Sequence, residues 1–217
     1  MKPSYIHKLI VQGEHQQLDF KFEIADSQKI ARTFSAFANT DGGKLLIGVK
    51  DNGTIAGVRS VEEYYMAEAA ANMYSKPEIK FKSKEWVVEG KKVLEITIPA
   101  SNEKPHYAQN EDGKWLAYIR VHDQNILANR VLVNTWKRKK SKEGTYINYT
   151  EKEKLLLEYL ENHDSITLSK FRRIAGISAY KAGNILTNFL TLNIIETEIS
   201  EKWTVYRLSG EFKEEEM

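Results

Sequence analysis

The stretch from residue 34 to residue 57, FSAFANTDGGKLLIGVKDNGTIAG, decides the fold of the first half of this chain. Its pattern predicts a helix that ends before the turn at 40–43, followed by a buried strand at 44–49. The Asp-Asn-Gly sequence at 51–53 predicts a tight hairpin turn, because Asn and Gly tolerate positive φ. Gly48 lies inside the predicted strand, which indicates that another backbone segment or a ligand approaches closely there.

Apolar spacing extends this prediction along the chain in both directions. A short helix capped by Ser4 and a half-buried strand come before the central stretch, and a helix beginning at Asp26 leads into it. After the hairpin, a capping-box pattern at Ser60 begins a third helix. The remaining predicted elements of this part are strands at 79–88, 92–99 and 115–121 and a closing helix at 127–136.

Composition excludes several classes of protein. The 217 residues include no cysteine, so a disulfide framework, a zinc ribbon and a thiol nucleophile are impossible. The apolar runs are too short to span a bilayer, and the N-terminal residues lack the apolar core of a signal peptide. A cytoplasmic location is therefore expected.

Charge is distributed unevenly along the chain, although the formal net charge is only +2. Residues 1–140 contain 22 Lys and Arg against 17 Asp and Glu, whereas residues 141–217 contain 10 against 13. The first part is mildly basic and the second part is acidic. This asymmetry is compatible with a nucleic-acid partner for the first part but does not require one.

The domain organisation is predicted from these shifts in composition. Residues 1–136 form a first domain, and the charged run at 137–145 is a basic linker, serving either as a solvated tether or as an arm that contacts phosphates. Residues 146–210 predict three helices followed by a hairpin, a spacing that resembles a winged helix-turn-helix domain. Residues 211–217 are an acidic tail.

A family resemblance rests on a set of motifs in the first domain. Glu14 is followed by Leu-Asp-Phe-Lys at 18–21, then Ala-Phe-Ala-Asn-Thr at 36–40, Gly-Gly at 42–43 and the strand and hairpin at 45–57. In this order the motifs resemble the Schlafen AlbA-like domain, a nucleic-acid-binding domain of many bacterial regulators. The resemblance covers roughly the first 135 residues. It implies an α+β fold with a mixed sheet, joined here to the small winged helix-turn-helix domain.

The same resemblance implies an alternative, enzymatic function. In animal Schlafen proteins the matching acidic positions form a three-carboxylate site for a divalent metal that cleaves RNA. Here those positions are Glu14, Asp19 and Asp51, with Lys21 nearby, and Mg²⁺ or Mn²⁺ would be the metal. Asp19 departs from the family pattern, which usually has the longer Glu. Asp51 is also explained as a turn residue and Asp19 as part of a solvated strand face.

Basic and aromatic residues are the candidates for contacts with nucleic acid. In the second domain, Asn184 and the cations of two predicted helices could contact base edges or phosphates, together with Ser178, Tyr180, Thr187 and Asn188. His106, Tyr107 and Tyr118 could stack on bases, although Tyr107 and Tyr118 are equally explained as core or interface aromatics. The candidate phosphate-binding and base-reading residues are Lys21, Lys44, Lys50, Arg120, Arg130, Lys137, Arg138, Lys139, Lys140, Lys170, Arg172, Arg173, Lys181 and Asn184.

Three functions remain open from sequence alone. The first is a DNA-binding transcriptional regulator that acts as a homodimer on nucleic acid. The second is the metal-dependent endoribonuclease, and the third is a scaffold whose second domain docks other proteins. No cofactor is expected beyond the Mg²⁺ or Mn²⁺ of the nuclease alternative. The chain has no GxxxxGK[ST] loop, and its five histidines lack the paired spacing of a zinc site.

Overall fold

The computed structural model describes residues 4–58, 60–141, 144 and 149–210. The chain divides into two compact units, Met1–Ala128 and Asn129–Met217. The α+β class with a mixed sheet, predicted from the sequence, is confirmed. Within the described part, none of the helices is both long and apolar enough to span a bilayer.

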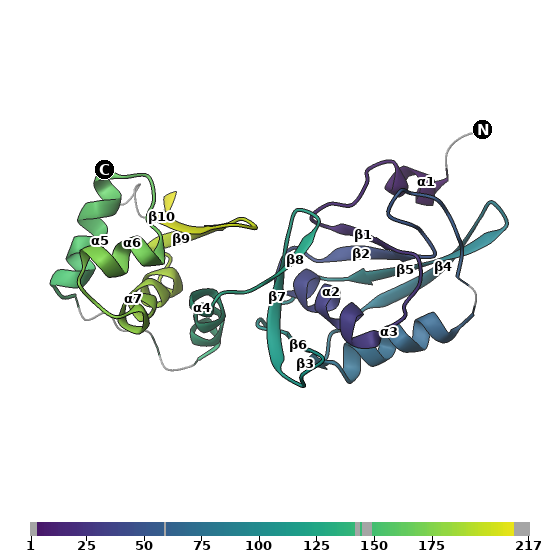
Figure 1. The fold of residues 1–217 in the computed structure, drawn as a ribbon, viewed down its shortest axis with the longest axis horizontal. Coiled ribbons are helices and arrows are strands. Elements are labelled where there is room, and N and C mark those ends of the chain that lie inside the picture. Colours follow the sequence, from purple (N-terminus) through teal and green to yellow (C-terminus); the bar gives the residue numbers. More distant parts are fainter. Residues whose placement is uncertain (1–3, 59, 142–143, 145–148, 211–217) are drawn as a thin grey trace. The chain divides into compact units, whose positions relative to one another are not determined.

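The first unit contains helices α1 to α3 and strands β1 to β8 (Figure 1). Ser4 and Asp26 cap α1 and α2, as predicted, because each side chain accepts a hydrogen bond from a backbone N–H of the first turn. The bounds are α1 Tyr5–Ile10, β1 Leu18–Lys21, α2 Ser27–Asn39, β2 Gly43–Ile47, α3 Glu62–Asn72, β3 Ser75–Lys76, β4 Lys82–Val88, β5 Lys91–Ile98, β6 Tyr107–Gln109, β7 Trp115–Val121 and β8 Gln124–Leu127.

Two four-stranded sheets flank α2. The first has the order β1-β2-β5-β4, with β1 parallel to β2 and the other pairs antiparallel, and the second has the order β3-β6-β7-β8. Apolar residues of α2 and α3 share one core with alternate residues of β2 and β5 and with Ala108 and Tyr118 of the second sheet. The other face of the first sheet packs against α1 through a separate core that contains Ile6, Leu46 and Val93.

Gly48 explains how the central stretch folds back on itself. Its backbone has a φ of +91°, and a Cβ placed there would lie 2.9 Å from the carbonyl carbon of Gly57. The Gly48 carbonyl accepts hydrogen bonds from the N–H groups of Ala56 and Gly57, which closes the hairpin. The close approach expected at this glycine is therefore to backbone of the same chain, where no side chain fits.

Asn39 holds the end of α2 to the second sheet. Its side chain is 2% exposed; Nδ2 donates to the backbone carbonyls of His106 and Tyr118, and Oδ1 accepts from the His106 N–H at 2.8 Å. The neighbouring Thr40 hydroxyl accepts from the backbone N–H of Arg120 at 2.9 Å. Asn39 and Thr40 thus satisfy backbone groups of the second sheet and of the loop that precedes it.

The second unit contains four helices and a β-hairpin. Its bounds are α4 Arg130–Lys140, α5 Glu151–Asn162, α6 Leu168–Ile174, α7 Ala179–Thr191, β9 Ile195–Ile199 and β10 Thr204–Leu208. The predicted succession of three helices and a hairpin is present in α5 to β10. One core joins these elements, and Val131 of α4 belongs to it.

The two units meet between Ala128 and Asn129, whereas the sequence predicts that the first domain ends at residue 136. Strand β8, which was not predicted, pairs with β7, and α4 packs against α7 in the second unit. Lys137 to Lys140 therefore lie in the last turns of α4 and not in a linker. The physical reason is that Asn129 caps the helix and that cations stabilise a helix C-terminus, so a charged run can be helical. Of the predicted linker, 142–143 and 145 lie outside the described residues, as does the acidic tail at 211–217.

We expect Asn39→Ala to lower the free energy of unfolding of the first unit by about 3 kcal/mol, because it leaves buried backbone donors and acceptors without partners. Urea unfolding followed by circular dichroism measures the change. Asn102→Ala, at an exposed loop position, is the control and should change stability by less than about 0.5 kcal/mol. Equal losses in the two variants would contradict the role assigned to Asn39.

Candidate nucleic-acid interface

Glu95 of β5 organises a cluster on the α1 side of the first sheet. The residue is 5% exposed, and its carboxylate accepts three hydrogen bonds, from Tyr5 Oη at 2.9 Å, Lys44 Nζ at 2.5 Å and Trp86 Nε1 at 2.7 Å. The Tyr5 and Trp86 rings contact each other with centroids 4.8 Å apart. A buried carboxylate thus fixes two aromatic rings and one cation at the surface.

The charge of this cluster is stable at neutral pH. Burial favours the neutral form of Glu95, but hydrogen bonds from Lys44, Trp86 and Tyr5 outweigh this effect and lower the pKa of the carboxyl group. In the same way, burial opposes the charge of Lys44, and the hydrogen bond to Glu95 nevertheless raises the pKa of the lysine. Both groups remain ionised, so the cation stays in place for an anionic ligand.

Two further lysines extend the positive charge across the sheet. Lys44 pairs with Thr97 of β5, and Thr97 pairs with Lys82 of β4, so both lysines lie on the α1 side. Lys84 follows Lys82 on the same face, and its Nζ lies 3.9 Å from the Trp86 ring centroid. We call Lys44, Lys82 and Lys84 the lysine face. Lys82 and Lys84 are exposed, and the Tyr5 side chain is 38% exposed, so cations and aromatic rings reach solvent together.

Sequence reasoning found Lys44 but missed Tyr5, Trp86, Lys82 and Lys84. The available signal was the alternation of lysines at 80, 82 and 84, which places them on one side of an extended segment. The contribution of Tyr5 could not be found in this way, because it reaches Glu95 from a helix that precedes it by 90 residues.

The three predicted metal ligands do not come together. Glu14 and Asp19 lie side by side, but Asp51 is an exposed residue of the hairpin turn. Asp19 is 3% exposed and is already bound by two cations, with Oδ1 3.2 Å from Arg120 Nη2 and Oδ2 3.0 Å from Lys21 Nζ. Among the described residues, no group of three or more His, Asp or Glu side chains could hold a metal ion. The residues present do not fit the three-carboxylate site.

Arg120 is an internal residue in this fold and not a surface cation. Its side chain is 1% exposed and reaches across to β1, where Nη2 donates to the Leu18 carbonyl at 3.3 Å and to Asp19; Nη1 donates to Asn125 Oδ1. The predicted phosphate contact by Arg120 is therefore replaced by a bridge between the two sheets. Tyr118 and His106 are also buried, which favours the structural alternative for Tyr118.

Other predicted cations of the first unit lie apart from the lysine face. Lys21 is bound to the acidic pair, and Lys50 is exposed beside the Phe22 ring at 5.6 Å. The Lys21 Nζ also donates to the Phe20 carbonyl at 2.7 Å. The structure does not place either residue in a shared surface with Lys44.

In the second unit, the first turn of α7 presents Tyr180 and Lys181 to solvent. Arg130 of α4 lies 5.0 Å from the Tyr180 ring, and Lys139 donates to Asn193 Oδ1. Further along α7, Thr187 is fully buried and Asn184 and Asn188 are half-buried, because α4 packs on this helix. In α7, the helix predicted to contact base edges, only the first turn is therefore exposed to solvent. Arg172 and Arg173 of α6 are exposed, whereas Lys170 is half-buried.

Glu14 provides a test of the acidic pair. Burial, and next the hydrogen bond with Asp19, raise the pKa of Glu14 from 4.5 to about 7, with Lys21 and Arg120 as the cations facing the pair. Because the folded state then binds the proton more tightly than the unfolded state, stability is lost as pH rises from 4.5 to about 7.

We expect Glu14→Gln to remove this part of the pH dependence, because the amide does not titrate. Urea unfolding of the native protein and the variant across that pH range measures the difference between their slopes. Glu23→Gln, at an exposed position, is the control and should keep the native slope. A native slope in Glu14→Gln would contradict the raised pKa.

Comparison with known proteins places the first unit in a family. The chain is similar to the DIP2311 protein from Corynebacterium diphtheriae, with a TM-score of 0.43 and 22% identity over 58% of this chain, and it spans only 24% of that protein. It is also similar to the N-terminal domain of a RecG-related protein from Nitrosomonas europaea, with a TM-score of 0.38 and 19% identity over 59% of this chain and 97% of that domain. A search of curated proteins finds no match. The family model described as Schlafen, AlbA_2 matches residues 14–129, more than half of the chain, and the protein therefore belongs to the Schlafen AlbA_2 family.

Proposed function

We propose that this protein binds nucleic acid and that the lysine face of the first unit holds the phosphate backbone. The observation that carries the proposal is the combination of Lys44, Lys82 and Lys84 with the partly exposed rings held by Glu95. Lysines supply sequence-independent contacts to phosphates, and adjacent aromatic rings can stack on unpaired bases. Because Glu95 fixes Lys44 and both rings in advance, little side-chain ordering remains to oppose binding.

The total charge of the first unit does not explain such binding. Residues 1–128 contain 17 Lys and Arg and 17 Asp and Glu, so their formal net charge is zero. A nucleic-acid contact by this unit must therefore depend on the local arrangement of charge. Residues 129–217 contain 15 cations against 13 acids, a small basic excess.

The finer proposal is a DNA-binding transcriptional regulator in which the second unit is a winged helix-turn-helix domain. It is supported by the succession of α5, α6, α7 and the β9–β10 hairpin and by the exposed cations Arg172, Arg173 and Lys181. In such domains the N-terminal residues of the second helix of the motif contact base edges, and the preceding helix contacts the backbone. Paired half-sites in DNA match a two-fold symmetric protein, so we expect a homodimer.

We expect the double variant Lys82→Gln/Lys84→Gln to weaken binding of a short fluorescent single strand and to lower the slope of log affinity against log salt by about 1.4, because two phosphate contacts are lost. Fluorescence anisotropy at several salt concentrations measures both quantities. The control, Lys29→Gln/Lys114→Gln, makes the same charge change at exposed positions away from the lysine face. An identical loss of slope in the two double variants would show that only total charge matters.

For the second unit, we expect Arg172→Gln/Arg173→Gln to lower the salt slope of duplex DNA binding by about 2, while single-strand binding by the first unit persists. The matched control is Lys152→Gln/Lys154→Gln on α5, which removes the same charge from the same unit. Unchanged duplex binding in the arginine variant would overturn the proposed contact, and equal losses in both variants would show a general charge effect.

A further inference from the structure

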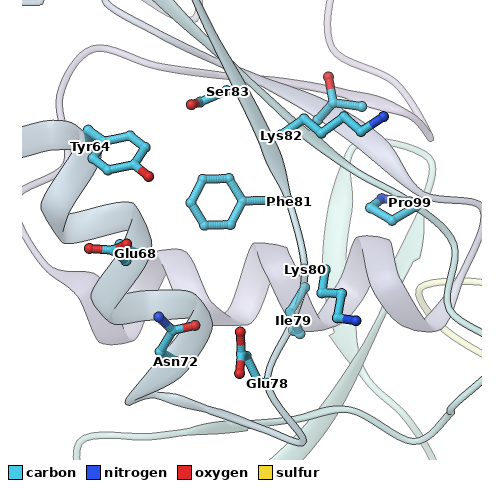
Figure 2. A pocket seen from close by; sticks show the side chains of 11 residues that line it. Tyr64, Glu68, Asn72, Glu78, Ile79, Lys80, Phe81, Lys82, Ser83 and Pro99 are labelled. Carbon is cyan, nitrogen blue, oxygen red and sulfur yellow. The ribbon is translucent and has the colours of Figure 1, made fainter.

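A pocket of about 690 Å³ opens between α3 and the segment that leads into β4 (Figure 2). None of the candidate residues identified from the sequence lines it. Its volume lies within the range of small-molecule sites, which is about 300–1,000 Å³. Figure 2 shows the Phe81 ring at the centre of the view, with side chains of α3 on one side and Lys80, Lys82 and Pro99 on the other.

The α3 side of the pocket is a row of hydrogen-bonding groups. Tyr64, Glu68 and Asn72 are spaced by four residues, so they lie on one face of the helix, with Glu68 between the other two. Glu68 is half-buried. Within the described residues, no hydrogen bond or ion pair engages the side chains of Glu68 and Asn72, so their polar atoms are available to a ligand.

The opposite side carries two cations, while a second carboxylate, that of Glu78, lines the pocket near Asn72 (Figure 2). Lys80 and Lys82 are exposed and line the pocket, and in Figure 2 their side chains extend away from the Phe81 ring. Lys82 also belongs to the lysine face, which connects the pocket with Lys44 across Thr97. The pocket and the lysine face therefore share Lys82, and both lie at the edge strand β4.

We propose that this pocket takes one unpaired base of a bound nucleic-acid strand and that it prefers guanine. The base stacks on Phe81, its Watson–Crick edge faces Glu68 and Asn72, and its phosphates lie at Lys80 and Lys82. The inference rests on the proposed nucleic-acid binding and adds a base preference to it.

The preference for guanine follows from the carboxylate. An ionised Glu accepts hydrogen bonds and donates none. Guanine presents two adjacent donors on its Watson–Crick edge, N1–H and the N2 amino group, which match the two oxygens of Glu68. Adenine and cytosine present a single amino group there, and the N3–H of thymine is flanked by two carbonyl oxygens that repel a carboxylate. A bidentate pair of this kind corresponds to about tenfold discrimination.

The test uses the full chain and a short fluorescent strand of thymidines with one central guest base. We expect a guanine guest to bind about tenfold more tightly than thymine in the native protein, with adenine and cytosine between them. Glu68→Gln should remove most of the advantage of guanine, because the amide replaces one acceptor by a donor. Phe81→Leu should weaken binding of every guest, because the base loses its stacking partner.

The control is Glu62→Gln on the same helix, which makes the same charge change outside the pocket and should retain the full guanine preference. Equal affinity for all four guests, or an identical preference in Glu68→Gln and the native protein, overturns the base pocket while salt-dependent binding leaves the proposed function standing. If no strand binds at low salt, both the pocket and the proposed function are overturned.

Discussion

The side chain of Asn39 is the contact on which the rest of the first unit depends. It ends α2 at a fixed place because its amide satisfies backbone groups of the loop at His106 and of β7. The chain then turns through Gly42, where a Cβ would lie 2.7 Å from the Ala100 nitrogen, and enters β2 directly. Lys44 follows Asn39 by five positions. The hydrogen bonds of Asn39 that join α2 to the second sheet therefore also fix the position of Lys44, the first residue of the lysine face.

The sequence predicted those features that local chemistry determines. Asn-Gly specified the hairpin, Ser4 and Asp26 specified helix starts, and the family motifs specified the α+β fold. Arg120 could not be placed, because an arginine in an alternating strand looks solvent-facing and its partner Asp19 lies 101 residues earlier. The charged end of α4 reads as a linker in the sequence because Val131, which places the helix in the core of the second unit, gives no local signal of that contact.

Buried ionic groups divide the first unit into two regions with different chemistry. Around Asp19 the buried Arg120 and the partly exposed Lys21 both pair with a carboxylate of the protein. Around Glu95 a buried carboxylate holds Lys44, Tyr5 and Trp86, whose side chains are each partly exposed. Because both acids are buried, what distinguishes the second region is that the exposed Lys82 and Lys84 lie on the same face of the sheet, and the proposed phosphate contacts belong there for that reason.

Strand β4 lies at an edge of the first sheet, and its charge affects how readily the protein associates with itself at high concentration. An edge strand exposes unpaired backbone groups that can join the edge of another molecule and seed aggregates. Lys82 and Lys84 bring like charges to that edge, so two copies approaching β4 to β4 repel each other before their backbones can pair. The lysines proposed to contact phosphates thus also disfavour edge-to-edge pairing of β4, and variants that neutralise them should be handled at low protein concentration.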